Sequence, residues 1–214
     1  MENFKPAYYF SKKALEEYKE IFLVEYVWEA ISNIKGFVEK ITKERGKKVV
    51  IGENTKVSDK AVIEGPVIIG NNCEIRPGSY IRENVIIGNN CVIRSETKNS
   101  LIMDNSNAAH LSYIGDSILG ENCNLGAGTI LSNLSLSEKP IILKVEDKEI
   151  NTGMKKFGAI LGNNVHTGSN ALTNPGTFIG KNSFIYPNAV VRKGFYHSNS
   201  IIKLKQQIEV VEKK

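Results

Sequence analysis

Aliphatic residues recur every six positions near the middle of the chain, at Ile51, Val57, Ile63, Ile69, Ile75, Ile81, Ile87 and Ile93. A small or compact residue follows each by four positions, at Thr55, Ala61, Val67, Cys73, Ser79, Val85, Cys91 and Thr97. A period of six fits neither an α-helix nor an ordinary strand, and it is typical of a parallel β-helix. The phase returns at Leu119, Leu125 and Leu131, and again from Leu161 to Val191. The spacing therefore predicts a mainly β solenoid.

Each hexad would make one short strand and one corner, so that three hexads close a triangular coil of roughly 18 residues. Successive coils would stack at the strand spacing of about 4.8 Å and pair their backbone groups. Gly and Asn stand at most corners, as in Gly70-Asn71-Asn72, where positive φ angles are needed. The period does not fix the hand of the solenoid.

Three segments follow from the pattern. Residues 1–48 have an apolar stripe at three- and four-residue steps and predict helices, with Ser11 as an N-cap. We expect this segment to cap the first coil, with docking of a partner as the alternative. Residues 49–192 form the predicted β-helix. Residues 193–214 form a basic tail that we expect to be helical.

Two stretches interrupt the hexads. Between Lys98 and Ile118 the phase is lost, because Ile93 and Leu119 lie 26 residues apart. Residues 134–157 form a polar excursion that keeps the phase, since 30 residues separate Leu131 from Leu161. The second stretch predicts a loop leaving one coil. The first would distort the wall, and regular scaffolds tend to carry their chemistry in such departures.

Composition excludes several classes of function. No run of about 18 apolar residues and no signal-like N-terminus is present, so we expect a cytoplasmic protein without a membrane partner. The net charge of +5 is concentrated in the tail, without the basic and aromatic interleaving of nucleic-acid binding. All three cysteines occupy inward slots, so we expect no metal site from them.

One of the three histidines, His110, lies inside the first interruption. A lone histidine is more often structural than catalytic. Here Gly126-Ala127-Gly128 forms a tight corner nearby in the sequence, and Arg76 and Lys98 are a pair of basic residues that precede the histidine. These surroundings favour a site.

The chain resembles a known family over roughly residues 50–192. The resemblance rests on four motifs: Arg76-Pro77-Gly78, Glu96-Thr97-Lys98-Asn99-Ser100, His110-Leu111-Ser112-Tyr113-Ile114-Gly115-Asp116 and Asn124-Leu125-Gly126-Ala127-Gly128-Thr129. They are similar to glucosamine-1-phosphate N-acetyltransferase, the hexapeptide-repeat domain of the bifunctional enzyme that makes UDP-N-acetylglucosamine. Residues 151–160 further resemble archaeal-type sugar-1-phosphate nucleotidylyltransferases. The resemblance implies a left-handed β-helix, a homotrimer with active sites between subunits, and acetyl-CoA as acyl donor.

The resemblance also implies a role for each matching residue. His110 would be the general base that takes a proton from the substrate amine, and the N–H of Ala127 would meet the developing oxyanion. The sugar phosphate would be bound by Arg76, Lys98 and Tyr113, and the sugar by Asn124 and Asn133. The coenzyme would be lined by Ala127, Ser169 and Pro187, with its phosphates near Lys193, Lys203 and Lys205.

Some features depart from the family. Leu134 replaces the usual tyrosine, four extra residues precede Glu96, and the excursion at 134–157 is longer. The first 48 residues cannot hold a nucleotidylyltransferase domain. Two alternatives therefore stay open: another amino-sugar 1-phosphate as acceptor, such as galactosamine 1-phosphate, or a non-catalytic trimeric module that partners a sugar-nucleotide pyrophosphorylase.

Overall fold

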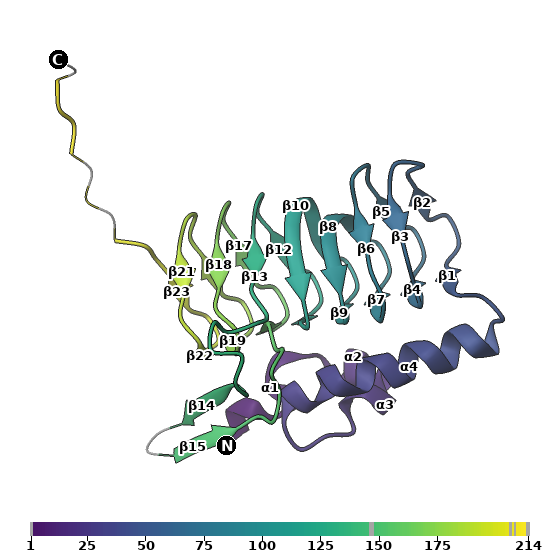
Figure 1. Ribbon diagram of the computed structural model, residues 1–214, viewed down its shortest axis with the longest axis horizontal. Helices are drawn as coiled ribbons and strands as arrows, with labels where there is room; N and C mark the ends of the chain where they lie inside the picture. Colours follow the sequence, from purple (N-terminus) through teal and green to yellow (C-terminus); the bar gives the residue numbers. More distant parts are fainter. Residues whose placement is uncertain (1, 146–147, 206, 208, 213–214) are drawn as a thin grey trace.

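The computed structural model describes residues 2–145, 148–205, 207 and 209–212, and it is a parallel β-helix with helices along one side (Figure 1). The helical elements come first and are η1 (Glu2–Phe4), α1 (Pro6–Tyr9), α2 (Lys12–Glu17), α3 (Lys19–Phe22), η2 (Val27–Glu29) and α4 (Ala30–Glu44). The predicted N-cap is confirmed, because Ser11 Oγ accepts a hydrogen bond of 3.1 Å from the N–H of Ala14.

The strands stack into three walls, which we call walls A, B and C. Wall A consists of β1 (Val49–Ile51), β4 (Val67–Ile69), β7 (Val85–Ile87), β9 (Ser100–Ile102), β11 (Ile118–Leu119), β16 (Ala159–Leu161), β19 (Thr177–Ile179) and β22 (Gly194–Tyr196). Wall B consists of β2 (Lys56–Val57), β5 (Glu74–Ile75), the starts of β8 (Val92–Lys98) and β10 (Asn107–Gly115), β12 (Asn124–Leu125), β17 (His166–Thr167), β20 (Phe184–Ile185) and β23 (Ile201–Ile202). Wall C consists of β3 (Val62–Ile63), β6 (Tyr80–Ile81), the ends of β8 and β10, β13 (Ile130–Leu131), β18 (Leu172–Thr173) and β21 (Val190–Val191). The predicted solenoid is confirmed.

Aliphatic side chains fill the interior in ladders. Ile69 pairs with Ile87, Ile87 pairs with Ile102, and all three are almost fully buried. Each such side chain contributes roughly 1.5–3 kcal/mol by leaving water. At the corner that joins walls A and B, asparagines adopt positive φ, as the sequence predicts, for example 55° at Asn72.

The first interruption is a set of shortened steps between inward residues. Four residues, instead of six, separate Ile93 from its successor Thr97, and five separate Thr97 from Ile102. The strand β8 therefore runs through the corner between walls B and C without a turn. Hydroxyl side chains face inward in this coil, and Ser95 Oγ lies 2.7 Å from Thr97 Oγ1 in the interior.

The N-terminal helices lie along wall A and do not cap the first coil, so that expectation is wrong (Figure 1). The outward side chains of wall A are apolar, including Ile86, Leu101 and Phe178, and they need a cover. Helix α4 packs its buried stripe against β4, β7 and β9. The first coil stays uncovered instead, with Ile51 45% exposed.

The excursion at 134–157 leaves the phase intact, as predicted, since Leu119 pairs with Leu161 across it. It is less polar than the sequence indicates. It contains an antiparallel hairpin of β14 (Ile142–Val145) and β15 (Lys148–Asn151), and the side chains of Ile141, Leu143 and Phe157 are buried against the helical layer.

The expected helical tail is wrong for the described residues. Strands β22 and β23 pair in parallel with β19 and β20, so the solenoid continues to Ile202. The described residues after Ile202 form neither helix nor strand. The apolar side chain of Ile202 packs on the interior cluster, which explains why strand pairing replaces a helix here.

Candidate functional site

A bulge in β10 brings His110 to the surface. Ile93 pairs with Ala108 and Ser95 pairs with Ser112, so the single residue Arg94 of β8 faces three residues of β10. These are Ala109, His110 and Leu111. Leu111 has a φ of 48° and is 63% exposed. The bulge lifts the exposed His110 out of the corner between walls B and C.

The Gly-Ala-Gly corner lies in the next coil, directly beside His110. The N–H of Gly128 donates to the carbonyl of His110 over 3.0 Å, and the N–H of Asn170 donates to the carbonyl of Ala127 over 2.7 Å. Gly128 has a φ of 71°, which a larger side chain would strain. Among the hydrogen bonds between described residues, none uses the N–H of exposed Ala127.

A depression of about 580 Å³ opens at this corner. Its lining includes five of the residues singled out from the sequence, namely Arg76, His110, Asn124, Ala127 and Ser169. The floor comes from wall B, through outward residues such as Val92 and Asn107. The structure therefore brings the proposed base, the proposed oxyanion donor and one proposed sugar ligand together.

Pro187, the remaining residue that the resemblance assigns to the coenzyme, continues the same row of corners. The N–H of Asn188 donates to the carbonyl of Ser169 over 2.9 Å, as Asn170 does to Ala127. Pro187 therefore occupies, one coil further on, the position that Ala127 and Ser169 occupy in theirs. The ammonium group of Lys203 lies 5.3 Å from the ring centroid of Tyr186, beside the end of this row.

Lys193 lies elsewhere, at the corner between walls C and A, where its Nζ donates to the carbonyl of Ile142 over 3.1 Å. Lys205 is exposed beyond the last strand.

Lys98, Tyr113 and Asn133 form a separate group at the corner between walls C and A. The phenol of Tyr113 donates to Asn133 Oδ1 over 3.3 Å, and Lys98 Nζ lies 3.7 Å from Glu83. Burial, followed by the charges of Glu96 and Asp116, raises the pKa of Tyr113. Its hydroxyl therefore stays protonated and can donate to an anion.

Two residues of this group were missed in the sequence. Asp116, 5% exposed, accepts hydrogen bonds from Asn133 Nδ2 over 2.5 Å and from Asn99 Nδ2 over 2.9 Å, and so it fixes the orientation of Asn133. Arg82 follows Ile81 just as Lys98 follows Thr97, and Ile81 pairs with Thr97 in adjacent coils. The guanidinium of Arg82 therefore lies on the same corner as the ammonium group of Lys98.

Arg82 is held by carboxylates but is not fully satisfied. Its Nη1 lies 3.2 Å from Glu96, its Nε lies 3.8 Å from Glu83, and that Nε is buried without a hydrogen-bond partner. Arg76 has a different setting, because its Nε donates to Glu74 over 3.0 Å at the corner between walls B and C. Within one chain, Lys98 therefore lies on the same corner as Arg82. Arg76 lies on a different corner.

The depression at His110 lies at the corner between walls B and C. Lys98 and Arg82 form a second group of cations at the corner between walls C and A, on the other edge of wall C. Arg94 marks one end and Lys98 the other, four residues apart along an extended strand. At about 3.3 Å per residue the two ends are roughly 13 Å apart. One chain therefore presents two partial sites, one at each edge of wall C.

The three cysteines lie in the apolar interior of the solenoid. All three are free and buried. Burial raises the pKa of Cys123 to about 12, so its thiol stays protonated. Within the described ranges, no group of three or more His, Cys, Asp or Glu side chains is arranged to hold a metal ion, and no helix is long and apolar enough to cross a membrane.

The stacked hexads and the hollow at His110 define the chain as a hexapeptide-repeat β-helix protein with a ligand-sized site at one corner. It belongs to the GMPPB C-terminal domain family, whose model matches residues 63–174.

Curated relatives confirm the resemblance stated from the motifs. The bifunctional protein GlmU of Methanococcus aeolicus is 42% identical over 120 residues, which are 56% of this chain and 29% of that protein. The bifunctional sugar-1-phosphate nucleotidylyltransferase/acetyltransferase of Sulfurisphaera tokodaii is 46% identical over 98 residues, which are 46% of this chain and 24% of that protein. The matched region thus spans less than a third of each relative.

Solved structures include a mutant of AntD, an N-acyltransferase from Bacillus cereus, in complex with dTDP and coenzyme A. It is 21% identical, with a TM-score of 0.46, and the match covers 76% of this chain and 82% of that one. A likeness at this level carries no argument about function.

Proposed function

We propose that the protein transfers an acetyl group from acetyl-CoA to the amine of glucosamine 1-phosphate, on the route to UDP-N-acetylglucosamine. The observation that carries the proposal is the bulge that holds His110 beside the Ala127 corner, linked to it through the hydrogen bond from Gly128. The names of the curated relatives support the same reaction class.

The chemistry needs no covalent enzyme intermediate. The imidazole of His110 takes a proton from the substrate amine as the amine nitrogen attacks the thioester carbonyl carbon. The carbonyl oxygen becomes an oxyanion, and the N–H of Ala127 donates to it, a contribution of roughly 3 kcal/mol. The carbon–sulfur bond then breaks, the protonated imidazole of His110 returns the proton to the leaving sulfur, and coenzyme A departs as its thiol. The pantetheine arm would follow the row formed by Ala127, Ser169 and Pro187.

The phosphate of the acceptor would be bound by Lys98 and Arg82, with a hydrogen bond from Tyr113. An arginine fork and a lysine point charge are a common pairing for phosphate groups. Asn133, held by Asp116, would contact the sugar hydroxyls together with Asn124. Arg76 would approach the anionic coenzyme or the acceptor from the side of the depression.

This assignment requires more than one subunit. The amine and the phosphate of glucosamine 1-phosphate stand on adjacent ring carbons, whereas the two partial sites are roughly 13 Å apart on one chain. A homotrimer would place the corner with Lys98 of one subunit against the depression of the next. Within the described part of the chain, the helices cover wall A and leave walls B and C available for such contacts.

A substitution tests the base. His110→Ala should lower kcat about 10²-fold or more, measured as coenzyme A release from acetyl-CoA and glucosamine 1-phosphate. His197→Ala is the matched control, because that side chain is also exposed but lies at the corner between walls A and B. Unchanged release in His110→Ala would refute the proposal. A panel with galactosamine 1-phosphate and with amino sugars that lack the phosphate would identify the acceptor.

Subunit mixing tests the shared site. His110→Ala and Lys98→Ala should each be strongly impaired alone. Co-expressed with different tags and purified as mixed oligomers, they should regain activity, because one interface then combines an intact His110 with an intact Lys98. Mixed oligomers that stay inactive would show that both residues serve one site within a chain. A complete lack of transfer with every acceptor in wild type would favour the non-catalytic trimeric module.

A further inference from the structure

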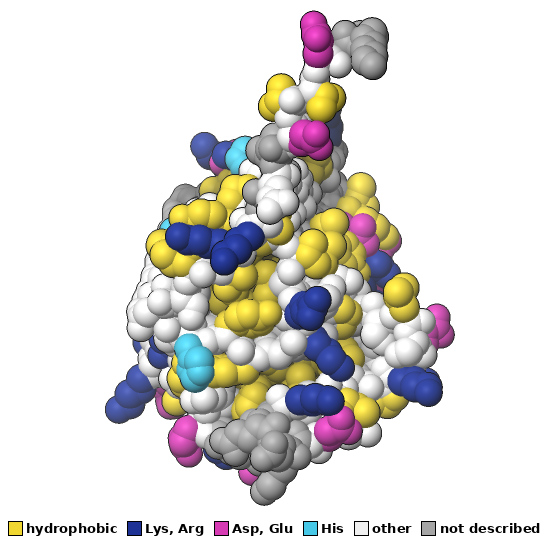
Figure 2. All heavy atoms as spheres, turned by 90° about the vertical axis from the view of Figure 1, so that its left-hand side faces the viewer, with side chains coloured by type: hydrophobic (Ala, Val, Ile, Leu, Met, Phe, Trp, Pro, Cys, Tyr) yellow, Lys and Arg dark blue, Asp and Glu magenta, His cyan; other side chains and the backbone are white. Residues whose placement is uncertain are grey.

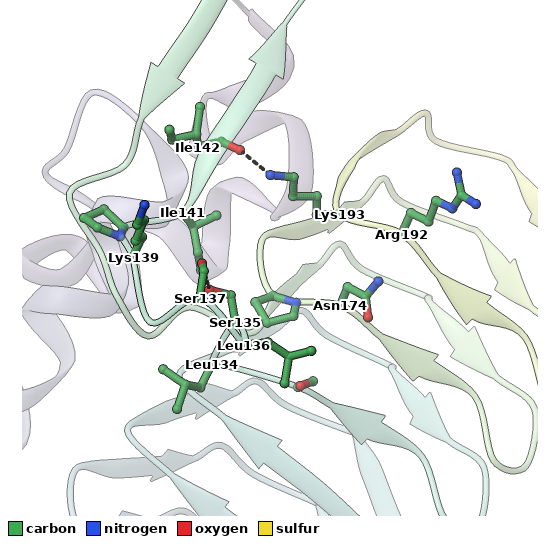
Figure 3. Close-up of a pocket in the computed structure, with 13 residues that line it drawn as sticks. Leu134, Ser135, Leu136, Ser137, Lys139, Ile141, Ile142, Asn174, Arg192 and Lys193 are labelled. Carbon is green, nitrogen blue, oxygen red and sulfur yellow. Dashed lines mark hydrogen bonds between the residues drawn. The ribbon is translucent and has the colours of Figure 1, made fainter.

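A second hollow, of about 700 Å³, lies where the excursion leaves the solenoid, and it shares no lining residue with the depression at His110. We call it the hairpin cavity. Figure 3 shows its two sides: residues of the excursion such as Leu134, Leu136 and Ile141, and corner residues of the last coils such as Asn174 and Arg192. Its volume is in the range of cavities that bind small molecules.

The charge of the hairpin cavity is positive. Lys139, Arg192 and Lys193 line it, and no carboxylate side chain does among the described residues. None of the ion pairs between described residues involves these three cations. Lys193 is fixed in place by its hydrogen bond of 3.1 Å to the carbonyl of Ile142 (Figure 3). The cavity is therefore suited to an anion.

The rest of the lining is partly apolar. Leu134 is 42% exposed and Leu136 is fully exposed, which leaves two leucines of a short surface segment in water. Pro140 and Pro175 add flat, rigid surface on the two sides of the cavity. Figure 2, which faces the end of the solenoid formed by the last coils, shows lysine and arginine side chains gathered around apolar surface at this end of the molecule.

Neutral polar groups complete the lining. Ser135 and Ser137 have their hydroxyl oxygens 3.0 Å apart, and Asn174 presents its amide from the opposite side. The cavity thus offers flat apolar surface, hydroxyl and amide groups, and cations. A nucleotide has three matching parts, which are its flat base, its ribose hydroxyls and its phosphates.

We propose that the hairpin cavity is a nucleotide-binding site, with the base against Leu134, Leu136 and the prolines and the phosphates on Lys139 and Arg192. Two sources share this chemistry: a free nucleotide, or the nucleotide end of a coenzyme whose thioester lies at a neighbouring subunit. A membrane surface fits less well, because the exposed leucines are few and border polar groups inside a hollow. The inference does not depend on acetyl transfer, since binding is measured without catalysis.

The test is direct titration of the full chain by calorimetry at about 0.15 M salt. Uridine 5′-diphosphate stands for a free nucleotide and adenosine 3′,5′-bisphosphate for the coenzyme end. We expect saturable binding of at least one of them, and the pattern identifies the source. The double variant Lys139→Gln and Arg192→Gln should raise the Kd about tenfold or more, because hydrogen bonds to charged groups are lost.

The matched control removes two charges elsewhere. Lys12→Gln with Lys60→Gln changes two exposed lysines outside the cavity and should leave the Kd unchanged. Leu136→Ser tests the apolar side and should weaken nucleotide binding without affecting inorganic phosphate. The proposal is overturned if neither nucleotide binds, if the double variant and the control weaken binding equally, or if inorganic phosphate binds as tightly as the nucleotides. Capture by phosphatidylserine vesicles that depends on Leu136, without nucleotide binding, would replace it with a membrane contact.

Discussion

Phe178 is the centre of the contact between the helical layer and wall A, and its truncation should destabilise the whole chain. Its side chain is 0% exposed, and its ring centroid lies 5.2 Å from that of Phe4, 5.8 Å from Trp28 and 5.2 Å from Phe157. These partners come from η1, η2 and the end of the excursion. Replacing a buried phenylalanine with alanine costs about 3–5 kcal/mol, because transfer and cavity terms add.

For a chain of this length, each kcal/mol shifts Tm by about 2–4 °C, so Phe178→Ala should lower Tm by roughly 6–20 °C. Thermal unfolding followed by circular dichroism measures this. Phe184→Ala is the matched control, since that side chain is 46% exposed on wall B, and it should change Tm by much less. Trypsin should also cut Phe178→Ala faster after Lys43, at the end of α4. Equal Tm shifts in the two variants would refute the claim that the helices are held by this cluster.

Three further changes follow from particular contacts. Asp116→Asn keeps the shape of the side chain but offers one oxygen to two amide donors. We therefore expect the free energy of unfolding in urea to fall by about 1–3 kcal/mol and the KM for the amino-sugar phosphate to rise. An unchanged unfolding midpoint would contradict the role of Asp116. Burial, followed by Tyr8, raises the pKa of Tyr9, so the folded state keeps this phenol neutral while the unfolded chain ionises it near pH ~10. Stability should therefore fall above that pH by about 1.4 kcal/mol per unit, and the slope should be smaller in Tyr9→Phe. Gly168→Ala would place a Cβ 2.5 Å from the Pro187 ring. It should therefore lower Tm and raise the KM for acetyl-CoA. A variant with wild-type values would show that this corner can relax.

The hexad pattern predicted the solenoid because inward positions are dictated by burial. Ile69, Ile75 and Ile81 must each face the interior at the same place in their steps, and burial leaves no other solution. The hexad pattern also predicted the position of the excursion at 134–157. The inward positions keep their phase on both sides of it, because a coil that pairs with its neighbours tolerates a loop of any length between hexads. The residues around His110 followed from motifs rather than from the period.

The proximity of Arg82 to Lys98 could not be predicted from the six-residue period. The step from Ile93 to Thr97 is shortened, so Arg82 and Lys98 become neighbours at a spacing that the regular period does not give. Only the pairing of Ile81 with Thr97 reveals it. The position of the helices was also hidden, because the outward side chains of wall A, such as Ile86 and Leu101, alternate with inward ones that are equally apolar. The sequence did not separate the two faces.

The hydroxyl-lined coil around Ser95 and Thr97 should affect where the molecule first unfolds. In a stacked array, stability is close to a sum of terms between adjacent layers, and a layer that buries hydroxyls in place of isoleucine side chains adds less to that sum. The weakest junction of the stack would then lie between the coil that carries Lys98 and the next coil, which carries the bulge. Partial unfolding would divide the molecule there into two blocks, and the residues that need freedom to close around a ligand would be the first to loosen.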